Sequence, residues 1–122
     1  MARVTGIGGV FLRAKGDRDS LLQWYRTHLG IDFEAEWGGR IFLGQESGVT
    51  WSIFDPSTSY FGSPDNAFMV NYTVDDLDGL LDQLRAAGVD VSDQVEESEY
   101  GRFGWCVDPD GRRIELWQPP SA

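Results

Sequence analysis

The clearest hydrophobic pattern in the chain lies in residues 75–87, where apolar positions recur every three or four residues. The positions that share this spacing are Leu77, Leu80, Leu81 and Leu84. They would share one face of a helix, so the spacing predicts an amphipathic α-helix. Asp75 or Asp76 can cap its first turn, and Gly88 can adopt the left-handed backbone that ends it.

A second segment with the same spacing covers residues 17–29. The apolar face of this predicted helix consists of Leu21, Leu22, Tyr25 and Leu29, and Gly30 ends it. After the final glycine, each helix is followed by an apolar, an acidic and an apolar residue, at 31–33 and at 89–91. The two helices therefore have similar sequence surroundings.

Short runs rich in β-branched and aromatic residues surround the helices and predict strands. They cover residues 7–13, 39–44, 49–54, 68–74, 103–107 and 113–117. The last two are joined by Asp-Pro-Asp-Gly at 108–111. In such a turn proline presets the backbone and glycine tolerates positive φ, so these two strands are expected to form a hairpin.

The two halves of the chain repeat each other. Three pairs of positions match at one constant offset: Gly48 with Gly111, Phe54 with Trp117, and Pro56 with Pro119. We expect a first module over about 4–56, a linker rich in Ser, Pro and Gly over about 57–66, and a second module over about 67–120. A chain of 122 residues has the length of one domain, so both modules are expected to form a single domain over 1–122.

Composition narrows the class of protein. Acidic residues outnumber basic ones by 20 to 10, and the formal net charge of -10 repels nucleic acid and anionic lipid. No apolar run approaches the roughly 20 residues that span a bilayer, and the first residues lack the apolar part of a secretory signal. The lone cysteine, Cys106, favours a buried thiol and a reducing compartment. We expect a cytoplasmic protein that binds neither nucleic acid nor membrane.

Four segments together resemble a known family. Residues 74–78 (Val-Asp-Asp-Leu-Asp), 84–88 (Leu-Arg-Ala-Ala-Gly) and 108–116 look like the second module of the vicinal oxygen chelate superfamily. Residues 24–30 look like the end of its first helix. This superfamily includes glyoxalases, extradiol dioxygenases and bleomycin-resistance proteins. The resemblance implies an α+β fold in which two tandem βαβββ modules form two curved sheets, one per module, around a shared pocket, with the helices outside.

Metal-dependent members of that family place ligands on the first and last strands of each module. Carried over to this chain, the four positions are Gly9, Ser52, Met69 and Glu115, and only Glu115 is a good ligand for a divalent transition metal. The single histidine, His28, precedes a helix-ending glycine, where a positive charge is favourable. We therefore expect no cofactor and no family-type metal site, apart from an ion held jointly by Glu115, waters and a substrate.

Strand alternation predicts which side chains share a pocket wall with Glu115. They are Phe11, Arg13, Arg40, Phe42, Ser52, Phe54, Met69, Asn71, Phe103, Trp105, Arg113 and Trp117, together with Gly9, Thr50 and Thr73. Aromatic walls with a few charges are typical of small-molecule clefts, although any one of these aromatic residues alone is more often part of a core. A buried carboxylate needs a partner, and Arg13, Arg40 or Arg113 could form a structural or functional pair with Glu115.

Several aromatic and acidic residues fall outside this wall. Four aromatic residues lie in loop-like segments: Trp37, Tyr60, Phe61 and Tyr100. They could cover a ligand or pack in a dimer interface. Trp24 and Trp51 have the wrong face for the pocket and fit a core or an interface. Residues 96–99 (Glu-Glu-Ser-Glu) are interpreted as a solvated acidic loop.

Two functions fit these features. The first is a metal-independent protein that binds or sequesters a small aromatic or amphipathic compound, as the resemblance to bleomycin-resistance proteins implies. The second is a glyoxalase-like lyase or isomerase that uses Glu115 as general base, with or without a recruited divalent metal. The missing ligands favour binding, and the retained Glu115 favours chemistry. A homodimer is expected, because modules this small leave sheet edges and aromatic residues that a two-fold partner would cover.

Overall fold

The computed structural model describes residues 1–43 and 48–121. Within these residues the elements are β1 (Val4–Arg13), α1 (Arg18–Leu29), β2 (Gly39–Phe42), β3 (Val49–Phe54), β4 (Phe68–Val74), α2 (Leu77–Ala86), β5 (Asp90–Val91), β6 (Glu96–Ser98), β7 (Gly101–Val107) and β8 (Arg113–Gln118). The six predicted strands and both predicted helices are present. Gly44, the last residue of the strand predicted over 39–44, lies outside the described residues.

The strands form one mixed sheet in the order β2-β3-β1-β4-β8-β7-β5, with β6 paired to β7. The two halves of the chain meet where β1 and β4 pair antiparallel. On either side of this seam lies a parallel pair, β1 with β3 and β4 with β8. The expectation of one sheet per module is wrong, because the first strands of the two modules hydrogen-bond to each other within the chain.

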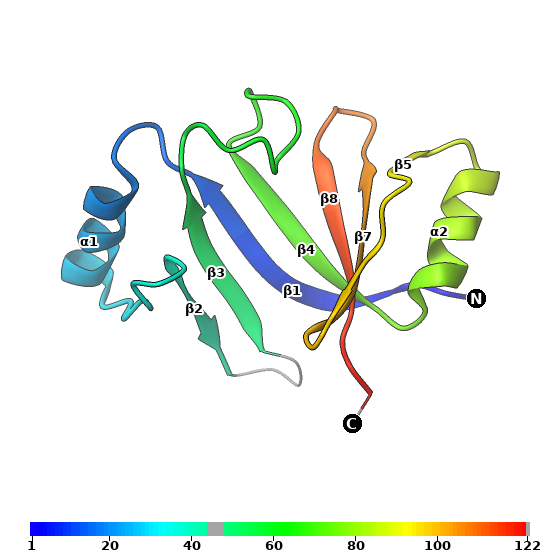
Figure 1. Ribbon diagram of the computed structural model, residues 1–122, viewed down its shortest axis with the longest axis horizontal. Coiled ribbons are helices and arrows are strands. Elements are labelled where there is room, and N and C mark those ends of the chain that lie inside the picture. Colours follow the sequence, from blue (N-terminus) through cyan, green and yellow to red (C-terminus); the bar gives the residue numbers. More distant parts are fainter. Residues whose placement is uncertain (44–47, 122) are drawn as a thin grey trace.

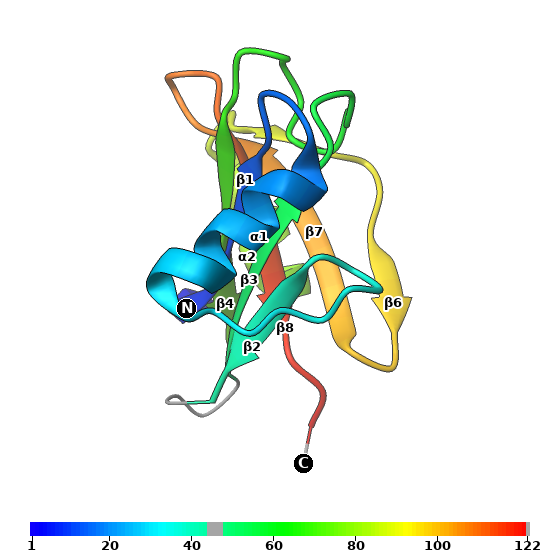
Figure 2. The same ribbon diagram turned by 90° about the vertical axis from the view of Figure 1, so that its left-hand side faces the viewer.

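The sheet is curved, and both helices lie outside it. In Figure 1 the strands near the seam lie at the back, while α1 and α2 flank the sheet on the left and right. The quarter-turn in Figure 2 places β6 and β7 on one side and β1 with β4 on the other. The concave face of the sheet therefore points toward the viewer in Figure 1.

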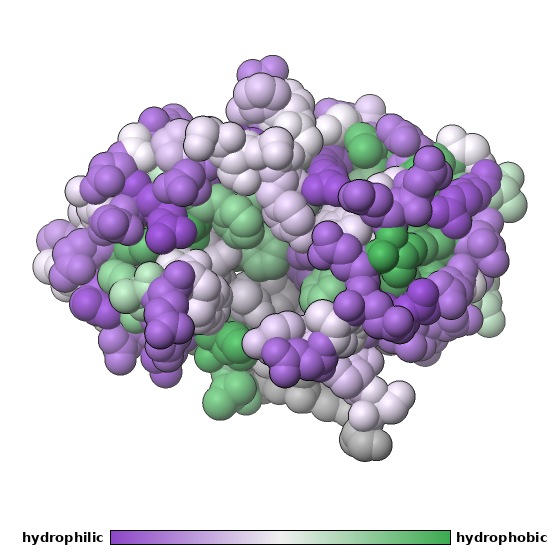
Figure 3. Space-filling model, in the orientation of Figure 1, coloured by the Kyte–Doolittle hydropathy of each residue, from purple (hydrophilic) through white to green (hydrophobic). Residues whose placement is uncertain are grey.

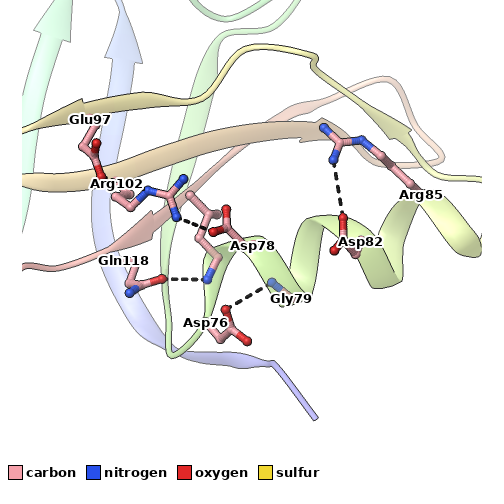
Figure 4. A network of polar contacts seen from close by, with 9 residues as sticks. Asp76, Asp78, Gly79, Asp82, Arg85, Glu97, Arg102 and Gln118 are labelled. Atoms are coloured by element: carbon pink, nitrogen blue, oxygen red, sulfur yellow. Dashed lines mark hydrogen bonds and ion pairs between the residues drawn. The ribbon is translucent and has the colours of Figure 1, made fainter.

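Helix ends follow the capping signals of the sequence. Asp17 accepts a hydrogen bond from the Ser20 amide at 3.0 Å, and α1 ends at Gly30, whose φ of 68° favours glycine. Asp76 caps α2 in the same way, through the Gly79 amide. Around this cap, Gln118 of β8 accepts from the Leu77 amide and Arg102 of β7 pairs with Asp78 (Figure 4). The start of α2 is thus tied to two strands. Within the described residues, no helix is long and apolar enough to span a membrane.

Each helix covers its own buried cluster. Leu22 of α1 packs with Ala14 and Ile53, whereas α2 contributes several leucines to a larger cluster. Members of this second cluster are Ala2, Val74, Leu77, Leu80, Leu81, Cys106 and Leu116. The Cys106 thiol is buried as expected, and burial raises its pKa, which keeps it in the unreactive thiol form.

The order of elements departs from βαβββ in both halves. Between α1 and β4 the described residues form two strands, β2 and β3, and an isolated bridge pairs Glu34 with Gly39. After α2 there are four, because β5 and β6 both pair with β7. The interpretation of residues 96–99 as a solvated loop is wrong for β6. The β6 side chains are all exposed, so their polar character does not distinguish a strand from a loop, and the pairing with β7 could not be predicted from them.

Candidate functional site

Three buried side chains form a row across the middle of the concave face. Glu115 on β8 lies directly opposite Asn71 on β4 and Trp105 on β7. All three are buried, and Glu115 is only 4% exposed. Directly paired residues point to the same face of a sheet, so register alone brings these three side chains together.

The Glu115 carboxyl group is held by two neutral donors. The Tyr60 hydroxyl donates to Oε1, and the Asn71 side-chain amide donates to Oε2 at 3.0 Å. Burial raises the pKa of Glu115 above its ordinary value, and these two hydrogen bonds offset that effect only in part. Burial and the nearby Glu115 charge also raise the pKa of Tyr60, so its phenol stays protonated and remains a donor.

Tyr60 and Phe61 belong to the linker between β3 and β4, which forms the green loops above the sheet in Figure 1. Their side chains reach Glu115 and the pair Phe11 and Met69, respectively. Phe61 is 0% exposed and packs with Phe11 and Met69. The Tyr60 ring stacks on Phe54, with ring centres 5.6 Å apart and planes 3° from parallel. From the sequence, these two residues were expected either to cover a ligand or to pack in a dimer interface. Two adjacent aromatic residues in a linker otherwise rich in Ser, Pro and Gly were the available signal that the linker folds inward.

The arginines proposed to neutralise Glu115 make other contacts. Arg13 donates to four carbonyl oxygens of the linker, those of Pro56, Thr58, Ser63 and Asn66. Arg113 donates to the Tyr60 carbonyl at 2.6 Å, and its guanidinium group lies 5.0 Å from the Trp105 ring centre. Arg40 donates to the Asp32 carbonyl at 2.8 Å. Among the described residues, none of these arginines forms an ion pair with Glu115, although the charge of Arg113 offsets part of the rise in the pKa of Glu115.

Arg40 and Phe42 lie on the other face of the sheet. Gly39 pairs with Ser52, so Arg40 pairs with Trp51 and Phe42 with Val49. Their expected place beside Glu115 is therefore wrong, because the register of β2 is shifted by one residue from the one assumed. The remaining predicted wall residues share the face of Glu115 by pairing and alternation: Phe11, Arg13, Ser52, Phe54, Met69, Asn71, Phe103, Trp105, Arg113 and Trp117.

The wall continues toward the C-terminal end of β8. Phe103 and Trp117 are directly paired, and their rings stack with centres 6.0 Å apart and planes 5° from parallel. Figure 3, seen from the concave side, shows a surface hollowed near its centre between two mainly hydrophilic flanks. A separate open depression of about 570 Å³ lies between α1 and the start of β4. Of its charged lining residues, Lys15 and Asp17 are exposed and Arg13 is half-buried. The buried polar row makes the concave face the better candidate.

Glycines on β1 leave room for the polar row. The β1–β4 register shifts between Ile7 and Gly9, which is a β-bulge at Gly8. A Cβ atom at Gly8 would collide with Asn71 Oδ1 and lie 2.7 Å from the Trp117 ring. A Cβ atom at Gly9 would lie 2.9 Å from the Thr50 carbonyl oxygen. Asn71 and Trp117 therefore occupy the space that a β1 side chain would need.

The four family ligand positions do not fit a transition-metal ion. Gly9 offers no side chain, and Ser52 and Met69 are poor donors for such an ion. Both oxygens of Glu115, the remaining member, already accept hydrogen bonds from the protein. In the part of the chain that the structure describes, no group of three or more His, Cys, Asp or Glu side chains is placed to hold a metal.

Comparisons with known proteins agree with this architecture. The methylmalonyl-CoA epimerase of Mycobacterium tuberculosis is 21% identical over 97% of this chain and 90% of its own, with a TM-score of 0.65. The Streptomyces coelicolor epimerase bound to 2-nitronate-propionyl-CoA is 17% identical over 98% and 100%, with a TM-score of 0.69. A glyoxalase/bleomycin resistance protein/dioxygenase superfamily member from Vibrio splendidus 12B01 is 16% identical over 97% and 99%, with a TM-score of 0.63. At these identities the likeness is one of fold.

The sequence comparisons give a more specific result. A comparison with curated proteins finds no match. The family model of the Glyoxalase/Bleomycin resistance protein/Dioxygenase superfamily, however, matches residues 9–116, which include the second half of β1, all of β4 and the whole polar row. The resemblance inferred from residues 24–30, 74–78, 84–88 and 108–116 is thereby confirmed. This chain belongs to the glyoxalase/bleomycin resistance protein/dioxygenase superfamily.

Proposed function

We propose that this protein binds a small aromatic or amphipathic compound on the concave face of its sheet, without a metal ion, and that Glu115 is the polar anchor of the site. The observation that carries the proposal is the buried Glu115 carboxyl group, which has neutral partners and aromatic neighbours. Burying a carboxyl group that has no ion-pair partner is unfavourable, and carboxyl groups in such surroundings are concentrated at functional sites. Membership of a superfamily whose members bind small molecules supports the same proposal.

A second candidate is a lyase or isomerase in which Glu115 acts as general base. The raised pKa of Glu115 favours it, because a carboxyl group that titrates nearer neutrality is a better proton acceptor. The epimerases that share the fold are isomerases by their names. At 16–21% identity, however, their likeness to this chain is one of fold alone. Deuterium uptake from D2O into a bound carbonyl compound would favour this candidate, and its absence would leave binding as the function.

Glu115→Gln should keep the fold and weaken ligand binding. Glutamine has the same shape but removes the charge, so a ligand found by thermal-shift screening should bind about tenfold more weakly or worse. Isothermal titration calorimetry measures this, with a chelator present to show that no metal is needed. Glu99→Gln, at an exposed position, is the matched control and should bind like the wild type. Equal affinities in all three proteins would contradict the role of Glu115.

The same variant has a pH-dependent stability with a defined sign. At pH values below the ordinary carboxyl pKa of 4.5, Glu115 is protonated in both folded and unfolded protein. As pH rises above this value, the unfolded chain releases the proton while the folded protein, whose pKa at Glu115 is raised, keeps it. The wild type should therefore lose stability relative to Glu115→Gln as pH rises above 4.5 and until the folded-state pKa is passed, as measured by urea denaturation. An unchanged difference would show that burial does not raise this pKa.

We further propose a homodimer. Large apolar side chains are exposed on several elements, among them Trp24, Ile41, Phe42 and Phe68, and a two-fold partner would cover some of them. Light scattering at micromolar concentration should give twice the chain mass of 13.7 kDa. A particle of one chain mass would contradict the proposal. Cytoplasmic residence, inferred from the lone cysteine, also stays a prediction.

A further inference from the structure

Tyr60 is surrounded by side chains that were predicted from the sequence to line the ligand pocket. Its ring stacks on Phe54 and meets the Trp105 ring edge-on, with centres 6.2 Å apart and planes at 83°. The Arg113 guanidinium group lies 5.3 Å from its centre, and its hydroxyl donates to Glu115. These four neighbours all come from strands of the sheet, whereas Tyr60 comes from the linker. The linker therefore places a phenol inside the proposed binding site.

The linker backbone is held without help from the Tyr60 side chain. Arg13 donates to carbonyl oxygens on both sides of Tyr60, and Arg113 donates to the Tyr60 carbonyl itself. The Asn66 side-chain amide adds bonds to the carbonyls of Phe61 and Gly111, at 2.9 and 3.2 Å. All these acceptors are backbone atoms, so the bonds that hold the linker do not depend on where the Tyr60 ring lies.

Two buried polar atoms beside Glu115 lack a hydrogen-bond partner among the described residues. They are Asn71 Oδ1 and Trp105 Nε1, on the two sides of the Glu115 carboxyl group. The Trp105 N–H lies close enough to the Tyr60 oxygen to favour its ionised form, yet it makes no hydrogen bond of normal geometry. Buried polar atoms are nearly always paired, so Tyr60 fills this site without satisfying it.

We propose that Tyr60 is an internal substitute for the ligand, and that the protein binds an uncharged phenol, a flat aromatic ring with a hydroxyl group, in its place. The ligand ring would stack on Phe54 beneath the Arg113 guanidinium group. Its hydroxyl would donate to Glu115 and accept from Trp105 Nε1. A ligand carboxylate in the same position would face the Glu115 carboxyl group and be disfavoured. This inference rests on the proposed function and names the chemical class of its ligand.

The test uses p-cresol, which is the tyrosine side chain as a free molecule. In the wild type p-cresol must compete with Tyr60, which reduces its apparent affinity by the fraction of time that the site is open. Tyr60→Ala removes the competitor and should bind p-cresol about tenfold more tightly or better. Tyr60→Phe keeps the ring but not the hydroxyl and should have an intermediate affinity. Isothermal titration calorimetry gives the three dissociation constants.

Control ligands and variants distinguish binding at this site from nonspecific binding. p-Xylene, which lacks the hydroxyl, should gain little from Tyr60→Ala, and Glu115→Gln in the Tyr60→Ala background should remove most of the gain for p-cresol. Tyr100→Ala, at a tyrosine that is 66% exposed, should bind p-cresol like the wild type. A folded Tyr60→Ala protein that binds p-cresol no more tightly than the wild type would overturn the inference. If Tyr60→Ala does not fold, equal affinity in Tyr60→Phe and wild type has the same meaning.

The failure of this inference can be told apart from failure of the proposed function. In one outcome, the wild type binds a screened ligand in a Glu115-dependent way, but Tyr60→Ala does not bind p-cresol more tightly. This outcome supports the proposed site and rules out a phenol as its ligand. If Glu115→Gln leaves the affinity for every ligand unchanged, p-cresol included, both the phenol inference and the proposed function are rejected.

Discussion

Replacing Phe61 with alanine should lower the free energy of unfolding by about 3–5 kcal/mol, because the change removes a fully buried aromatic side chain and leaves a cavity. The Phe61 ring lies 5.1 Å from the Phe54 ring centre and 5.2 Å from the Arg13 guanidinium carbon. It also packs against Phe11 and Met69, beneath the linker. Urea denaturation followed by tryptophan fluorescence measures the loss.

Phe68→Ala is the matched control for this prediction. Phe68 belongs to β4 and is 48% exposed, so its truncation should lower the free energy of unfolding by about 1 kcal/mol or less. A large difference between the two variants would show that the linker is part of the core. Equal losses would contradict the buried position of Phe61.

Replacing Arg13 with methionine should cost about 2–4 kcal/mol of stability, because methionine keeps the apolar stem but cannot donate hydrogen bonds. The guanidinium group donates to four linker carbonyls, at 2.7 Å to Thr58, 3.0 Å to Pro56 and Asn66, and 3.5 Å to Ser63. Hydrogen bonds from a charged donor are among the stronger ones in proteins. Their loss should loosen the linker and with it the Tyr60 contact to Glu115.

Two measurements separate this effect from a general loss of charge. Arg3→Met removes a positive charge from an exposed residue at the N-terminal end and should change stability little. Amide hydrogen exchange in Arg13→Met should speed up at Gly62 and Asn66, whose amides are bonded within the linker. Unchanged exchange there, with wild-type stability, would mean that Arg13 does not organise the linker.

Local patterns predicted the helices well. The spacing of Leu77, Leu80 and Leu81 placed the second helix within two residues of its observed ends, because burial against the sheet needs an apolar face. Asp17 and Asp76 cap the helices through contacts three residues away in sequence. Such short-range contacts are encoded in a few adjacent residues, so they can be inferred without the tertiary structure.

Strand pairing was harder to predict from the sequence. Alternation correctly grouped Arg113, Glu115 and Trp117 on one face, because it depends on a single strand. It failed for Arg40 and Phe42, because their face depends on which β3 residue they pair with. A shift of one residue turns every side chain to the opposite face, and the short β2 strand has no turn signal that sets its register.

The sequence by itself determined that this is an α+β chain of two related halves, with Glu115 among aromatic residues and without the family's metal ligands. Only the tertiary structure decided that the halves join into one sheet through β1 and β4, and that Tyr60 rather than an arginine is bonded to Glu115. Tyr60 and Glu115 are 55 positions apart, and their contact depends on a linker held by Arg13. The physical reason is that periodicity records burial along one element, whereas these contacts arise from how distant elements pack against each other.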